Sequence, residues 1–299
     1  CNDCTVHCPR DARPGDVLQV VRSLVIETLA VPRSLGRLVA NAKTTWPILF
    51  GVPILFWLVL LGAMGRLAPP ADFHAYEQIV PHSVLYAVFF PMTGLVALAA
   101  FLSGRRYWQM MGDAAPRSKS FLSGLWATTM DISNHKRFGS CGAAHFRRLG
   151  HLLLFWGFVG AAVTSGLLIV AIYIQGYEMP LPLLHPYKLL GNISAVALVV
   201  GVGILMVARY TDNDRAGSST SYDTFFTTVV ALVIFTGVLV ELVRVLTPGL
   251  PGLAVGSYIL HLGVITTLFV TFPYSKFAHM LYRTLAMIHE QAVVPDRRP

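Results

Sequence analysis

Histidine and cysteine are the side chains of this chain whose types and spacing could do chemistry. Two histidines, His261 and His279, lie 18 residues apart in the last apolar segment. At 3.6 residues per turn this is five full turns, so one continuous helix would present both from the same face, roughly 27 Å apart along its axis. That separation is close to the roughly 30 Å thickness of a bilayer's hydrocarbon core. The spacing therefore predicts two haem irons stacked across a membrane, each ligated by one of these imidazoles.

The inner haem needs a second imidazole from another helix. His151 opens the third apolar segment level with His279, and these two residues are expected to ligate an inner haem b. Arg147 and Arg148 lie just before His151 and are expected to contact the haem propionates.

The outer haem, also of b type, needs a partner for His261 near the opposite membrane surface. His185 is the expected partner because it begins the fourth apolar segment, and His82, at the start of the second, is the alternative. Ionisable groups inside a membrane are costly and therefore functional candidates, although such histidines could instead cap helices or relay protons. Lys188, one turn after His185, is predicted to contact a quinone, with an interfacial anchor as the equal alternative.

A cysteine motif opens the chain. The stretch CNDCTVHCP places Cys1, Cys4 and Cys8 like the last three cysteines of the bacterial ferredoxin run C-x2-C-x2-C-x3-C-P. Cys1 and Cys4 are therefore expected to ligate one [4Fe–4S] cluster and Cys8 a second. Zinc and disulfides are the alternatives, but zinc sites rarely use this spacing and cytoplasmic disulfides are rare. Because the ligand set is incomplete, the sequence is interpreted as the C-terminal part of a longer polypeptide.

A third group of possible ligands lies between the second and third apolar segments. His135, Cys141 and His145 suggest a metal site, but no standard zinc spacing is present. A docking surface for a soluble partner is the preferred interpretation of this loop.

The composition indicates which elements must position these residues. Hydrophobic residues make up 55% of the 299 residues and charged residues 13%, with a mean hydropathy of +0.60, whereas soluble domains carry about 25% charge. Six stretches are long and apolar enough to cross a membrane. They lie at about 46–67, 80–102, 150–174, 189–208, 222–246 and 255–278.

The net charge of +8 has a one-sided distribution. In the six-span topology, 20 of the 23 Lys and Arg residues fall on one side. This positive-inside pattern predicts an inner-membrane protein with both termini in the cytoplasm, and it excludes nucleic acid as the reason for the basic charge.

These observations predict an all-α, six-span protein with a four-helix haem-binding bundle, preceded by the C-terminal end of a two-[4Fe–4S] ferredoxin-like domain. Between Asp16 and Lys43, apolar runs interrupted by Pro32 are typical of short amphipathic helices on a membrane surface. The expected parts are a ferredoxin remnant with linker, two membrane helices, a basic cytoplasmic loop, the cytochrome b bundle and a cytoplasmic tail, at 1–45, 46–102, 103–149, 150–280 and 281–299.

The last apolar segment also carries a resemblance. The stretch HLGVITTLFVTFPYSKFAH is similar to the last helix of respiratory nitrate reductase gamma subunits, which carries two haem ligands at this spacing around an F-P-[FY]-S-[KR] segment. The resemblance implies that His151 and His279 hold the inner haem. The second ligand of that family falls here on Ala161, so the chain departs from the pattern at the outer haem.

With the cysteine motif ahead of it, the chain resembles the QmoC family, the membrane subunits of the quinone-interacting membrane-bound oxidoreductase complex. The resemblance implies an electron-transfer subunit of an oxidoreductase that is a hetero-oligomer. Electrons would pass from menaquinol in the membrane quinone pool, through haem b and iron–sulfur clusters, to cytoplasmic flavin and iron–sulfur subunits that serve adenylylsulfate reduction. A haem-free six-span transporter or proton channel, or a haem-free membrane anchor, is the alternative.

Overall fold

The computed structural model describes residues 5, 8–10, 12–70, 73–112, 120–135, 145–211, 220–247 and 249–293. Within these ranges the regular elements are all helical, as expected. They are α2 (Pro14–Leu29), α3 (Arg33–Ala40), α4 (Ala42–Ala63), the short 3-10 helix η1 (Tyr76–Gln78), α5 (His82–Met111), α6 (Phe121–Ser133), α8 (His145–Tyr173), α9 (Pro186–Thr211), α11 (Ser221–Leu246), α12 (Pro251–Thr271) and α13 (Ala278–Val293).

Six of these helices are long and apolar enough to cross a membrane, which confirms the expectation of a multi-pass membrane protein. They are α4, α5, α8 from Phe146 onward, α9, α11 and α12. Much of their surface is exposed and apolar, as a lipid environment requires.

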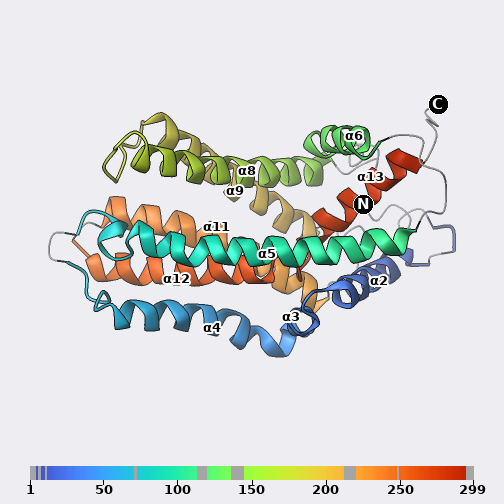
Figure 1. The fold of residues 1–299 in the computed structure, drawn as a ribbon, viewed down its shortest axis with the longest axis horizontal. Helices are drawn as coiled ribbons and strands as arrows, with labels where there is room; N and C mark the ends of the chain where they lie inside the picture. Colours follow the sequence, from blue (N-terminus) through green and yellow to red (C-terminus); the bar gives the residue numbers. More distant parts are fainter. Residues whose placement is uncertain are drawn as a thin grey trace.

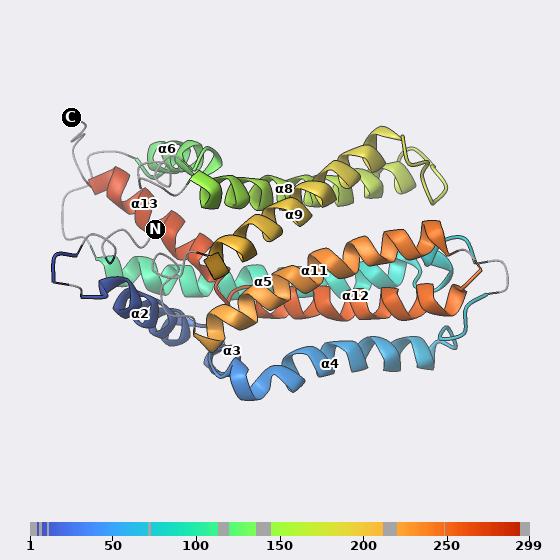
Figure 2. The ribbon, with the colours of Figure 1, turned by 180° about the vertical axis from the view of Figure 1, so that it is seen from behind.

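The six helices form two groups that lie side by side (Figure 1). One group is the hairpin of α8 and α9, which pack closely because glycines face the partner helix. A methyl group added at Gly157 would lie 2.8 Å from Leu198 of α9, and one at Gly201 would lie 2.9 Å from the backbone of α8. The other group consists of α4, α5, α11 and α12 (Figures 1 and 2).

Helix α4 packs directly on α12, although the predicted haem-binding bundle comprised only the third to sixth spans. The fully buried Trp57 donates from Nε1 to Thr266 Oγ1 at 2.9 Å, and Thr267 Oγ1 donates to the carbonyl of Leu49 at 2.9 Å. Gly263 allows the close approach, because a methyl group there would lie 2.5 Å from Ile54 Cγ1. The core around α12 therefore includes the first span.

The last apolar segment is not one continuous helix, which corrects the geometry expected for its two histidines. Helix α12 ends at Thr271 and α13 begins at Ala278. Pro273 lies in the break and has no N–H to continue the helical ladder. The Thr271 carbonyl instead accepts from the backbone N–H groups of Tyr274 and Ser275 at 3.0 and 2.8 Å. Consequently His261 and His279 lie on different helices.

Four helices that are not spans gather at one end of the molecule, called here the α13 end. It contains α2, α3, α6 and α13 (Figure 1). Pro32 precedes the first residue of α3, as the predicted interruption between two short helices requires. Cys1 and Cys4 lie outside the described residues, so the ferredoxin-like part stays a prediction.

Candidate functional site

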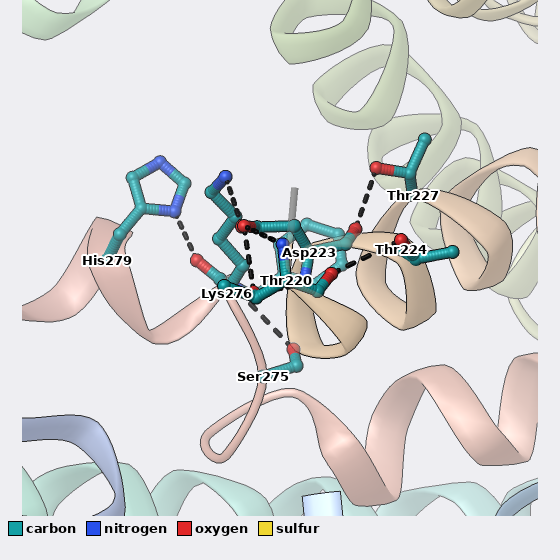
Figure 3. A network of polar contacts seen from close by, with 8 residues as sticks. Thr220, Asp223, Thr224, Thr227, Ser275, Lys276 and His279 are labelled. Carbon is teal, nitrogen blue, oxygen red and sulfur yellow. Dashed lines mark hydrogen bonds and ion pairs between the residues drawn. The ribbon is translucent and has the colours of Figure 1, made fainter. Parts of the chain in front are cut away.

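His279 lies in the first turn of α13, directly after the break, and its surroundings fix its orientation. Its Nδ1–H donates to the carbonyl of Lys276 (Figure 3). Burial lowers the pKa of the His279 imidazole to about 4, so the ring is neutral near pH 7. With the proton on Nδ1, the Nε2 atom carries the lone pair that a metal would use.

The break itself is held by the start of α11. Lys276 Nζ donates to Asp223 Oδ1 at 2.7 Å, and Asp223 forms a capping box with Thr220 (Figure 3). In that box the Asp223 N–H donates to Thr220 Oγ1, while the Thr220 N–H donates to the Asp223 carboxylate. Lys276 thus forms an ion pair with Asp223 through its side chain, and its backbone carbonyl accepts the hydrogen bond that orients His279.

His151 lies near His279 and contacts a third histidine. The ring centres of His151 and His279 are 6.5 Å apart, with the ring planes at 88°. His135, just beyond α6, also contacts His151, with His135 Nε2 and His151 Nδ1 2.9 Å apart. His135 adopts a left-handed backbone with a φ of 48°, which is uncommon outside glycine. His151 of α8 therefore contacts the imidazoles of both His279 and His135.

Two arginines precede His151, and they have different partners. Arg147 donates from Nη2 to the carbonyl of Ala208 on α9 at 3.3 Å, whereas Arg148 donates from Nη2 to the carbonyl of Asn134 at 3.0 Å. Arg147 thus links the two helices of the hairpin, while Arg148 lies beside His135. Their role as propionate contacts stays a prediction.

His261 lies at the midpoint of α12, ten residues from either end. Its Nδ1 is 2.8 Å from Thr236 Oγ1 of α11. When the Thr236 hydroxyl donates its proton to the carbonyl of Leu232, which lies at 2.6 Å, the imidazole donates to the hydroxyl and keeps its lone pair on Nε2. Gly237 makes room for the ring, since a methyl group there would lie 3.0 Å from His261 Cε1.

The residues proposed as partners of His261 have other contacts. His82, the first residue of α5, lies 3.4 Å from Glu77, and the His185 ring contacts those of Tyr177 and Tyr187. Within the described ranges no contact joins His261 to His82 or His185. Because a helix rises 1.5 Å per residue, His261 lies about 15 Å from either end of α12. The outer haem therefore stays a prediction.

Lys188, predicted as a quinone contact, forms an ion pair. Its Nζ lies 2.8 Å from Glu241 Oε2, and Arg244 contacts the other oxygen of the same carboxylate at 2.9 Å. This cluster joins α9 to α11 at the end opposite α13.

Of the other predicted metal ligands, the structure describes the side chain of Cys8 but not those of Cys141 and His145. Cys8 is a free thiol, half-buried, while Cys141 and the side chain of His145 lie outside the described residues. Over the described ranges, no group of three or more His, Cys, Asp or Glu side chains is arranged to hold a metal ion.

Two site residues, Thr236 and Asp223, and the contact of His135 with His151 were not predicted from the sequence. Asp223 carried a readable signal, because Thr220 and Asp223 have the spacing of a capping box at a helix start. The other two arise from contacts between helices and have no local signature.

Comparison with known proteins gives a family for most of the chain. The family described as Citrate utilization protein B matches residues 31–299. A curated protein of that name from Escherichia coli is 26% identical over 279 residues, covering 90% of this chain and 72% of the relative. No solved structure matches the chain.

This match overturns the assignment to the QmoC family and to a quinone-interacting oxidoreductase. Menaquinol-linked electron transfer and adenylylsulfate reduction, which followed from that resemblance, are wrong for this chain. The terms cytochrome b, iron–sulfur, respiratory complex and sulfate reduction are also wrong as a description of its family. The haem-free transporter, channel and anchor gain no clear support from the match.

The physical reason for the error is that the resemblance rested on two short motifs. Two histidines at a given spacing can indicate which cofactor a helix could bind, but they do not indicate the reaction or the partner proteins of the whole protein. Haem b, the clusters, menaquinone and the cytoplasmic partner subunits stay predictions about ligands and partners.

Proposed function

Because the chain belongs to the citrate utilization protein B family, we propose that it is a multi-pass membrane protein of citrate utilization in which His151 and His279 ligate a haem. The observation that carries the haem proposal is the arrangement of these two imidazoles at the α13 end. The family supports the role in citrate utilization, and the arrangement of the two imidazoles supports the haem.

The distance between the two rings fits a metal between them. Imidazole nitrogens bind divalent metals at about 2.0–2.1 Å, so two rings on one metal have centres a little over about 6 Å apart. The centres of His151 and His279 are 6.5 Å apart. No rearrangement of the helices is needed to reach a ligating separation.

Each of the two rings is also oriented by a second group, as metal-bound imidazoles usually are. His279 donates from Nδ1 to the carbonyl of Lys276, and His151 Nδ1 lies within hydrogen-bonding distance of His135 Nε2. These bonds place the ligand lone pair on Nε2 of each ring when the proton stays on Nδ1.

Haem fits this site better than a bare metal ion. A structural zinc ion needs four ligands, and the described residues offer no group of three or more. A porphyrin supplies four nitrogens to its own iron and needs only two axial imidazoles. When bound, such a six-coordinate haem supplies one-electron chemistry rather than a free coordination position.

The chain's own residues determine how the haem would be held. Helix α8 presents His151, while the break held by Asp223 presents His279. The basic segments at the α13 end favour placing that end in the cytoplasm, as positive-inside topology predicts. Assembly with cytoplasmic subunits is part of the same proposal.

The experiment is a haem determination on the full chain purified in detergent. We expect haem in the wild type, loss of most of it in His279→Ala, and retention in His289→Ala. His289 is the matched control because it lies on the same helix, with its ring near Trp108 and its Nε2 3.2 Å from the carbonyl of Gly112. A wild type without a b-type α band, or full haem content in His279→Ala, would refute the proposal.

A further inference from the structure

Helix α6 is not one of the spans, and it packs on α13 through one face. Gly124 and Thr128 are buried on that face. A methyl group added at Gly124 would lie 3.1 Å from the carbonyl oxygen of Ile288 of α13, so the two helices are in close contact there. Because residues four apart lie above one another on a helix, Gly124 and Thr128 mark the side of α6 that faces protein.

The other side of α6 is exposed and apolar. Leu122 is 73% exposed and Trp126 is 68% exposed. At 100° per residue, Leu122 points about 160° away from Gly124. The other large apolar side chains exposed on this helix are Phe121, Leu125 and Met130. No exposed residue of α6 is charged, and its single charged residue, Asp131, is half-buried.

Two hydroxyl groups lie on the same side of α6 as Trp126, and both are bonded within the helix. Thr129 Oγ1 donates to the carbonyl of Leu125 at 2.8 Å, and Ser133 Oγ donates to the carbonyl of Thr129 at 2.8 Å. A hydroxyl bonded four residues back has its donor satisfied without water. This is what a helix side that faces lipid requires.

The C-terminal end of α6 lies at the level where a span begins. The carbonyl of Asn134 accepts from Arg148 Nη2 at 3.0 Å, and His135 Nε2 is 2.9 Å from His151 Nδ1. Arg148 and His151 lie in the first two turns of the span that starts at Phe146. Figure 1 accordingly shows α6 beside the beginning of α8. The helix is therefore placed at one boundary of the membrane.

The apolar surface of α8 begins at the same level. Phe146 and Leu149, in its first turns, are both exposed, as lipid-facing residues of a span should be. The 13 residues of α6 are about 20 Å long, which is too short to cross a hydrocarbon core of about 30 Å. In Figure 1 the turns of α6 overlap, whereas the spans are seen along their length, so its axis is strongly inclined to theirs.

Cationic residues flank α6 in the sequence on both sides. They are Arg117, Lys119, Lys136 and Arg137. Lysine and arginine next to a membrane attract anionic headgroups, and tryptophan is enriched at the membrane interface. A short helix with one apolar side and flanking cations is typical of helices that lie in the interface plane.

We propose that α6 is such an interfacial helix, with Leu122 and Trp126 inserted among the acyl chains of anionic phospholipids at the α13 end. A soluble protein partner is the other possible occupant of this side. Lipid is favoured because the side adjoins the lipid-facing start of α8, and because it lacks the polar rim that interfaces between proteins usually carry. Neither this argument nor its test depends on bound haem.

The first experiment measures tryptophan fluorescence of the purified full chain in nanodiscs that contain phosphatidylglycerol, with or without lipids brominated near the headgroup end of their acyl chains. The difference between wild type and Trp126→Phe gives the Trp126 emission. We expect the brominated lipids to remove most of it and aqueous iodide to remove little. Trp108→Phe is the matched control, because the Trp108 ring packs on Phe121 and His289 at the same end of the molecule. Lipid quenching of Trp126 no greater than that of Trp108 would overturn the proposal.

The second experiment identifies what covers α6 in native membranes. Photoreactive benzoylphenylalanine replaces Trp126, and the full chain is illuminated and analysed by mass spectrometry. We expect a mass increase of one phospholipid. Glu290, exposed near the C-terminal end of α13, is the control position and is expected to give no lipid adduct. An adduct between the Trp126 position and another protein, or no adduct at that position, would overturn the proposal.

Discussion

Replacing Asp223 with alanine is expected to lower the free energy of unfolding by about 3 kcal/mol. The side chain of Asp223 is 9% exposed and that of Lys276 is 29% exposed, with 2.7 Å between Nζ and Oδ1. Breaking a fully buried pair costs about 3–5 kcal/mol, but the partly exposed Lys276 can recover water, so about 2 kcal/mol is expected for the pair. Loss of the carboxylate half of the capping box adds about 1 kcal/mol.

The assay is reversible unfolding in mixed micelles with increasing SDS, followed by circular dichroism. A double-mutant cycle with Lys276→Met isolates the pair, and the coupling is expected to be about 2 kcal/mol. Thr224→Ala is the control, since Thr224 is exposed in the same helical turn and bonds only to the carbonyl of Thr220 among the contacts described (Figure 3). That variant is expected to change stability by less than about 0.5 kcal/mol.

The cycle also tests how the site is positioned. Because Lys276 holds His279 through its carbonyl, Asp223→Ala is expected to reduce haem retention as well as stability. A coupling energy below about 0.5 kcal/mol would show that the ion pair behaves as an exposed one, and the reasoning about the break would then fail.

Three further predictions concern contacts between spans, each measured by the same SDS unfolding. Gly263→Ala should lower the free energy of unfolding by about 1–3 kcal/mol, because it forces a methyl group against Ile54. Gly256→Ala on the same helix should be neutral or stabilising, because a methyl group there would have nothing within 4 Å. Equal effects of the two substitutions would contradict the close packing at Gly263. Thr236→Val should cost about 1–3 kcal/mol by leaving His261 Nδ1–H without its acceptor, and Thr236→Ser should restore stability if that bond is responsible. Lys188→Met should cost less than about 1 kcal/mol because Arg244 still neutralises Glu241; a loss above about 2 kcal/mol would mean that the cluster is effectively buried.

The membrane helices could be predicted because their signal is local. A helix that faces lipid must be apolar along its whole length, and this requirement is visible without any knowledge of its neighbours. The short helices on either side of Pro32 were readable for a similar reason, since proline ends one helix and begins another.

The break after Thr271 was not readable, although Pro273 lies within it. Proline is a weak signal in membrane helices, and two prolines lie inside α4 and one inside α5. Contacts from α11 accompany the break: Tyr222 OH donates to the Tyr274 carbonyl at 3.1 Å, and Asp223 pairs with Lys276. Such contacts join residues about 50 positions apart and leave no mark in the local pattern.

The candidate site was predictable in part. His151 and His279 were expected to lie at the same level, and the structure places their rings near each other. The contact of His135 with His151 was missed because it depends on how α6 lies against α8. The family could not be read from the ligand pattern, since the same imidazole spacing can serve proteins with different partners.

Because of the break between α12 and α13, the orientations of His261 and His279 are set independently of each other. In one continuous helix, a single inserted residue would turn everything after it by about 100° and shift it by about 1.5 Å. Here the break is tied to α11 through Tyr222 and Asp223, and Tyr274 OH donates to the carbonyl of Val31 at 2.8 Å. His279 thus takes its alignment from α11 and the α2–α3 junction, while His261 takes its own from α12. The orientation of His279 toward His151 is therefore expected not to depend on the helical register of His261 in α12.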